Sequence, residues 1–152
     1  MLPLFGDRKP FPFVQTEGYE LYGHFSPNGH WIAYTSNEAG GTNQVYVQGF
    51  PTSGAKWQIS KDGGAQPRWS RDGKELFYVS ADSKLMVVPV KSGPSSFEPG
   101  VPRVLFDLHT RILFENFDIS ADGQKFLINN VVEEAAVSPA TVVLNWTADL
   151  KK

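Results

Sequence analysis

Short, largely continuous apolar runs with strand-like residues occur along the chain, and turn-forming residues separate them. The clearest pattern occurs three times, at residues 26–34, 70–78 and 120–128. In each copy a serine precedes Asn-Gly or Asp-Gly, and an apolar strand-like run follows. Such a pair supplies the positive φ angle of a tight turn, so the pattern predicts three β-hairpins. Because the serine recurs with the turn, we expect its hydroxyl to bind the turn backbone rather than act in catalysis.

Further apolar runs after each hairpin predict additional strands. Third strands are expected at residues 45–47, 85–88 and 142–144, and fourth strands at 13–16, 57–60 and 103–106. Four short strands in about 45 residues are typical of one blade of a β-propeller. The tryptophans fall in the expected strands, and we expect them in the core between blades; they are Trp31, Trp57, Trp69 and Trp146.

The repeat divides the chain into a partial blade at residues 1–16, complete blades at 17–60 and 61–107, and a blade without a fourth strand at 108–152. Helix is expected at most over a turn or two within 131–137. Three blades are fewer than the roughly four to eight that close a ring. We therefore expect an all-β propeller in which two copies form six blades, each chain's first strand completing the other's last blade. The alternative is a fragment of a longer propeller with unpaired edges.

The hairpin pattern also resembles a known family. Residues 25–38, 67–78 and 142–147 are similar to TolB-like, WD40-like propeller repeats in the C-terminal part of bacterial Ser/Thr protein-kinase-like proteins. The resemblance covers nearly all of residues 2–152. It implies a propeller, usually of six blades, that binds partners or ligands after a kinase domain and a membrane anchor. The chain has no Gly-rich phosphate loop and no His-Arg-Asp or Asp-Phe-Gly motif, so kinase activity does not carry over.

Composition narrows the class of function. The 152 residues include 14 Lys and Arg against 16 Asp and Glu, so no basic excess indicates a nucleic-acid partner. The absence of cysteine excludes disulfides, thiolate zinc sites and a cysteine nucleophile. No apolar run approaches the ~18 residues of a membrane span, and no secretory signal is readable. The cytoplasm is therefore the default compartment, although the propellers that the chain resembles usually lie outside the membrane.

Three polar residues share one position of the repeat, two residues before each hairpin serine. They are His24, Arg68 and Asp118. First strands line the central channel of a propeller, so we expect these side chains to form a polar ligand site there. Glu38 and Arg111 are the charged groups that a partner would reach most easily on one rim. The loops expected on that rim are residues 37–43, 61–66, 109–111 and 129–139.

The sequence favours a non-catalytic interaction module that binds a protein, peptide or small ligand through its loops or channel mouth. It contains no Gly-x-Ser-x-Gly nucleophile motif and no convergent histidines, so we expect no metal and no cofactor. One alternative is a metal-dependent hydrolase or lyase in the channel, with ligands among His24, Asp118 and Glu115. Another is a vestigial half-propeller without a ligand.

Overall fold

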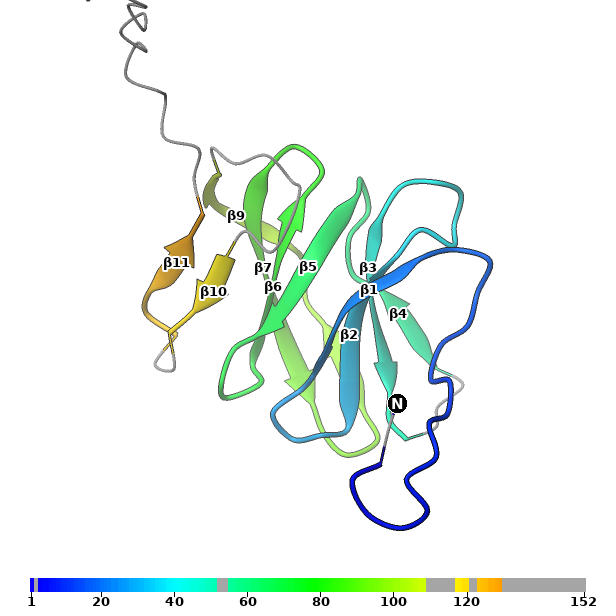
Figure 1. The fold of residues 1–152 in the computed structure, drawn as a ribbon. Helices are drawn as coiled ribbons and strands as arrows, with labels where there is room; N and C mark the ends of the chain where they lie inside the picture. The colour runs from blue at the N-terminus through cyan, green and yellow to red at the C-terminus, as the bar shows by residue number, and fades with distance from the viewer. Residues whose placement is uncertain (2, 52–54, 109–116, 121–122, 130–152) are drawn as a thin grey trace, which may run out of the picture.

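The part of the chain that the computed structural model describes is built from antiparallel β-sheet, with no helix among its residues (Figure 1). This part comprises residues 1, 3–51, 55–108, 117–120 and 123–129. The strands are β1 (Glu20–Phe25), β2 (Trp31–Ser36), β3 (Gln44–Gly49), β4 (Lys56–Gln58), β5 (Gly64–Trp69), β6 (Glu75–Ser80), β7 (Lys84–Ser92), β8 (Phe97–Pro99), β9 (Arg103–Asp107), β10 (Phe117–Ile119) and β11 (Phe126–Ile128). None of these residues belongs to a helix long and apolar enough to cross a membrane.

The strands form two sheets and a hairpin. The first sheet has the order β1-β2-β3-β4, and the second has β5-β6-β7-β8, with β9 also paired to β7. The third hairpin consists of β10 and β11. Figure 1 shows the three units side by side in chain order, from blue and cyan through green to yellow and orange. Over the described residues these units are stacked in a row and do not close into a ring.

The three predicted hairpin turns are confirmed, and their serines bind the backbone as expected. The carbonyl oxygens of Ser26, Ser70 and Ser120 accept the N–H of the turn glycine at 2.9, 3.0 and 2.8 Å. The hydroxyls of these serines accept the backbone N–H groups across the hairpin, at 3.0, 2.9 and 2.9 Å; the donors are Trp31, Glu75 and Lys125. Gly29, the first turn glycine, has φ of 73°, which explains the residue type at this position.

Most of the expected third and fourth strands are present. Residues 45–47 lie in β3, 85–88 in β7 and 103–106 in β9, while β4 includes residues 57 and 58 of the expected 57–60. The structure adds β8, which the sequence did not predict and which pairs with the far end of β7. Residues 131–137 and 142–144 lie outside the described residues.

The strand expected at residues 13–16 is not formed within the single chain. These residues form no strand, and Phe13 and Val14 instead pack on an apolar cluster of the first sheet around Ile32, Tyr34 and Tyr46. A strand needs a hydrogen-bonded neighbour, and the structure pairs residues 13–16 with none of the described strands. The apolar residues of this segment therefore pack on the first sheet through their side chains.

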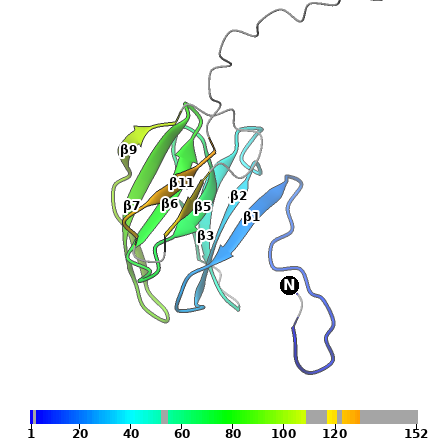
Figure 2. The same cartoon turned by 60° about the vertical axis from the view of Figure 1, so that its left-hand side comes forward.

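Two apolar cores lie between the three units. The first, between the two sheets, includes Trp31 and Ala33 on one side and Leu76 and Tyr78 on the other. Trp57 and Trp69 pack against it, which confirms the core position predicted for these three tryptophans, whereas Trp146 lies outside the described residues. The second core joins the opposite side of the second sheet to the third hairpin (Figure 2). Both sides of the second sheet are thus buried.

Candidate functional site

The first strands of both sheets contain the same irregularity. In β1 the register with β2 shifts between Leu21 and His24, and Tyr22 within this β-bulge has φ of 55°. The corresponding bulge in β5 contains Gln66, with φ of 58°, and precedes Arg68. A positive φ is uncommon for such residues, and bulges of this kind redirect the side chains that follow. His24 and Arg68 therefore occupy equivalent positions at the end of their bulges.

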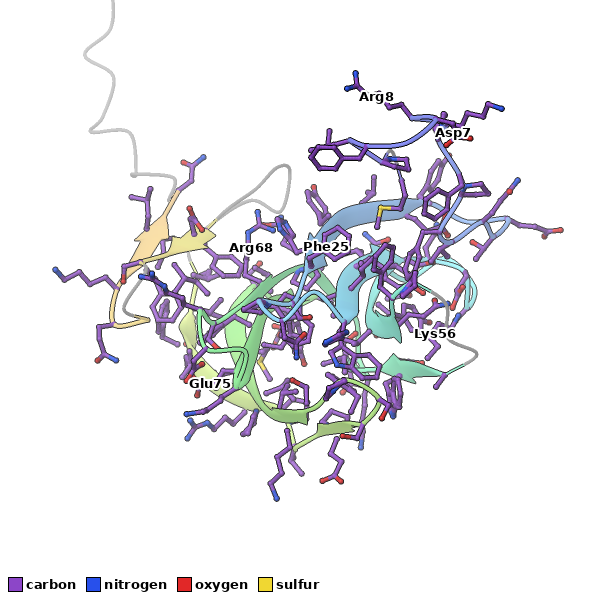
Figure 3. All side chains as sticks on the ribbon, turned by 90° about the horizontal axis from the view of Figure 1, so that it is seen from below. Asp7, Arg8, Phe25, Lys56, Arg68 and Glu75 are labelled. Carbon is purple, nitrogen blue, oxygen red and sulfur yellow. The ribbon has the colours of Figure 1, made fainter. Side chains whose placement is uncertain are left out.

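His24 and Arg68 contact each other, whereas the sequence predicted only that both line a common channel. Nη1 of Arg68 lies against Nε2 of His24, and both side chains are half-buried. A guanidinium can only donate, so Nε2 of this imidazole is the acceptor. The indole N–H of Trp69 donates to the His24 carbonyl oxygen at 3.2 Å and links β5 to β1 a second time. Figure 3 shows Arg68 at the edge of the molecule where β1 and β5 lie.

Two other candidate residues, Asp118 and Glu38, are placed elsewhere. Asp118 is exposed in β10, and its carboxylate accepts the N–H of the adjacent Ile119 at 2.8 Å. Glu38 forms an ion pair with Lys56, whose ammonium also lies over the ring of Tyr46, 4.9 Å from its centroid. Arg111 and Glu115 lie outside the described residues. The structure thus brings together two of the three candidate channel residues, His24 and Arg68.

Three loops meet at one rim of the molecule. The N–H of Gly64 donates to the Asn43 carbonyl oxygen at 2.8 Å, which ties the loop at residues 61–66 to that at 37–43. A Cβ added to Gly63 would lie 2.8 Å from Cβ of Ala81 and 3.3 Å from Cγ2 of Thr42. The common rim predicted for these two loops is therefore confirmed, and the β6–β7 turn joins them there.

A cleft of about 650 Å³ opens beside this rim, between the loop that follows the first sheet and strands β6, β7 and β9 of the second sheet. Its apolar lining includes Met86, Val101 and Val104, and the last two are 83% and 51% exposed. The charged residues at its margin are Lys61, Asp62, Asp82 and Lys84. The cleft therefore combines an apolar wall with charges of both signs.

Polar contacts fix the chemistry of this margin. Lys84 and Ser80 hydrogen-bond to the Asp82 carboxylate and lower its pKa, and Asp82 in turn raises the pKa of Lys84 across a 2.8 Å ion pair. Burial, reinforced by the negative charges of Asp62 and Asp82, raises the pKa of Tyr78. The phenol in the cleft therefore remains a neutral hydrogen-bonding group near neutral pH.

Sequence reasoning did not identify Val104 as a cleft residue. Strict alternation would place Val104 and Phe106 on the same side of β9. A register shift opposite Leu85 and Met86 places Val104 across from Met86 and Phe106 across from Leu85. Phe106 accordingly contacts Phe126 of the third hairpin, with ring centroids 5.7 Å apart, while Val104 lines the cleft. The sequence predicted a strand at residues 103–106, but the side of the strand on which Val104 lies depends on the bulge.

Across the described residues, no group of three or more His, Cys, Asp or Glu side chains is placed to hold a metal ion. No protein-family model matches the chain, and no curated protein matches it either.

Proposed function

We propose that this chain is a non-catalytic binding module that holds an extended peptide segment in the rim cleft. The observation that carries the proposal is the cleft itself, with its apolar wall and its charged margin. Its volume of about 650 Å³ lies within the ~300–1,000 Å³ of typical ligand pockets. The apolar wall can bury an apolar side chain of the peptide, and the charged residues at the margin can bind its backbone and its neighbouring polar groups.

Strand β9 favours a peptide over a compact ligand. It pairs with β7 on one side and lies at the edge of the molecule (Figure 2). All five of its residues are exposed. An extended peptide can add to such an edge by backbone hydrogen bonds and insert alternate side chains into an adjacent pocket. Val104 and Val101 are placed to receive one of these side chains, because both line the cleft beside β9.

We further propose that the two sheets and the third hairpin are blades of a TolB-like, WD40-like propeller with about three blades per chain. The repetition of the serine turn and of the bulge in β1 and β5 supports this architecture. The stacking of the units in chain order supports it as well. In such a ring, the bulged first strands would face the channel, and His24 and Arg68 would lie at its wall. A homodimer would supply six blades.

Selection from a displayed library of random linear peptides tests the binding function. We expect enriched peptides to bind the Val104→Glu variant at least about tenfold more weakly than the wild type, because the variant places a charge in the apolar wall. The control is Leu105→Glu, a neighbouring residue of β9 that is 38% exposed and does not line the cleft. It should change affinity by about twofold or less. Failure to enrich any peptide, or equal binding to both variants, would overturn the proposal.

A further inference from the structure

We propose that the side of the first sheet formed by Ile32 and Tyr34 is an interface for a second copy of this chain, filled by the third hairpin of that copy. The inference rests on the proposed propeller architecture and names the partner surfaces that the ring would use. It is carried by two repeated packing arrangements and by an apolar cavity where the repetition is incomplete.

The same two-sided packing occurs at both internal interfaces. Leu76 of the second sheet packs towards the first sheet, where Ala33 faces it in a shared cluster. Phe126 of the third hairpin packs towards the second sheet, with its ring centroid 5.3 Å from that of Phe77. The residue equivalent to Leu76 and Phe126 in the first sheet is Ile32, which belongs to the cluster on the opposite side from Ala33. By repetition, the side of the first sheet that contains Ile32 is the side on which a preceding sheet would pack.

An aromatic cluster between the two sheets shows how the outer strand of one sheet packs on the next. Trp57 of β4 contacts Phe97 of the second sheet, with centroids 5.1 Å apart and planes inclined by 56°. Trp69 of β5 meets the same ring edge-on, at 6.2 Å and 85°. These three rings join the fourth strand of the first sheet to the side of the second sheet.

A closely similar cluster lies on the Ile32 side of the first sheet. Phe13 and Phe50 have centroids 5.8 Å apart and planes inclined by 53°, and Phe25 meets Phe50 edge-on at 5.0 Å and 86°. Phe13 and Phe25 precede Trp57 and Trp69 by 44 residues each, the spacing of the repeat. Phe13 therefore packs on the first sheet as the fourth strand of a preceding sheet would. The N-terminal segment supplies this outer contact without the inner strands beside it.

A cavity occupies the place where the inner strands of a preceding sheet would lie. It has a volume of about 400 Å³ and lies between the N-terminal segment and the first sheet, lined by residues that include Leu21, Phe25, Ile32 and Tyr34. Leu21 and Phe25 are 47% and 50% exposed. At the interface between the two sheets, the corresponding space holds side chains such as Ala33 and Val47, both fully buried. The Ile32 side is therefore an interface of the same kind with its inner partner missing.

The third hairpin carries the complementary surface. Phe126 and Ile128 face the second sheet, whereas Leu127 between them is 77% exposed. Leu127 follows Phe77 by 50 residues and is its repeat equivalent. Phe77 is the residue through which the second sheet contacts the third hairpin. The second sheet separates the two surfaces within one molecule (Figure 1). A second copy can bring them together, and two copies placed head to tail around a twofold axis satisfy both pairs.

Light scattering during size-exclusion chromatography of the full chain tests this interface. We expect the wild type to have twice the mass of one chain. Phe25→Glu and Leu127→Glu should each have the mass of one chain, because both charges replace exposed apolar side chains of the free monomer and would be buried in the interface. An equimolar mixture of these two variants should regain a two-chain species, since one intact pair of surfaces remains. Leu105→Glu serves as the control and should keep the wild-type mass.

A wild-type mass of one chain at every concentration would overturn the interface, as would a two-chain mass that persists in both variants. Assemblies larger than two copies would overturn the twofold closure. Circular dichroism checks that each variant keeps its sheet content, and the mixture experiment separates a lost interface from a lost fold. If the wild type is a monomer while Val104→Glu still weakens peptide binding, the interface fails and the proposed function stands.

Discussion

The hydroxyl of Ser70 accepts the backbone N–H of Glu75 at 2.9 Å, because the Ser70 carbonyl oxygen is already bound by the N–H of Gly73 at 3.0 Å. Because the turn occupies the carbonyl oxygen of the serine, the side-chain hydroxyl accepts the hydrogen bond that closes the hairpin. The same exchange at Ser26 and Ser120 explains why this residue recurs with the turn.

Replacing Ser70 by alanine should destabilise the protein by about 1–2 kcal/mol, since a half-buried backbone N–H loses its acceptor. For a chain of this length the thermal midpoint should fall by about 3–6 °C. Thermal unfolding followed by circular dichroism measures the change. Ser95→Ala, at an exposed position, should leave the midpoint unchanged within error. A midpoint in Ser70→Ala equal to that of this control would show that the hydroxyl is dispensable.

Asp72 should make the second hairpin sensitive to acid. The N–H of Lys74 and the hydroxyl of Ser70 hydrogen-bond to its carboxylate and lower its pKa below the ordinary value of 3.8. A group with a lowered folded pKa contributes stability above its unfolded pKa and loses it as the pH falls through the folded value. Asn28 holds the same position in the first hairpin with an oxygen that accepts the equivalent two bonds, at 2.7 and 3.0 Å. Asp72→Asn should therefore keep the turn without its titration.

The midpoints of the wild type and Asp72→Asn, measured across a pH series, test this linkage. Their difference should stay constant from about pH 7 to about pH 5 and change below about pH 4 in the direction that disfavours the wild type. A difference that is the same at every pH down to the acid limit of folding would contradict the prediction.

The indole of Trp69 should stabilise the contact between the two sheets beyond its packing. Its N–H donates to the His24 carbonyl oxygen, and its ring meets Phe97 edge-on. Trp69→Phe keeps a ring at a position where the first sheet naturally has Phe25, but it removes the hydrogen bond. Trp57→Phe is the matched control, because Trp57 also contacts Phe97 and the structure shows no indole hydrogen bond for it within the described residues.

Urea unfolding should show that Trp69→Phe costs about 0.5–1.5 kcal/mol more than Trp57→Phe. Equal losses in the two variants would mean that the indole N–H contributes nothing to stability. A larger loss in Trp57→Phe would place the main stabilisation in ring packing instead.

Local chemistry made the hairpins predictable, whereas tertiary packing decided the rest. The turn at Asp72 and Gly73 depends on a few neighbouring residues, and the sequence pattern identifies it directly. The bulge at Gln66 depends on how β5 fits its neighbours, and no local pattern marks it. The shared repeat position of His24 and Arg68 predicted a common channel wall, but their direct contact depends on how β1 packs beside β5. Strand β8 and the side of β9 on which Val104 lies both depend on the register with β7, which alternation alone does not determine.

Gly63 offers a test of the close packing at the rim. Its φ is 96°, and a Cβ at this position would lie 2.8 Å from Cβ of Ala81, well inside van der Waals contact. Gly41 has a nearly identical φ of 95°, and an added Cβ there would meet nothing within 4 Å. Alanine at Gly41 therefore measures the cost of the backbone conformation alone, and alanine at Gly63 adds the cost of crowding two loops.

Gly41→Ala should cost about 1 kcal/mol of unfolding free energy, and Gly63→Ala about 1–3 kcal/mol more. The excess should fall when Ala81→Gly is combined with Gly63→Ala, since the substitution removes the atom that the new methyl group meets. Urea unfolding of the single and double variants completes the cycle. If the double variant is as unstable as the sum of its parts, the loops do not touch at this point. The rim would then lack the rigid side that the cleft requires.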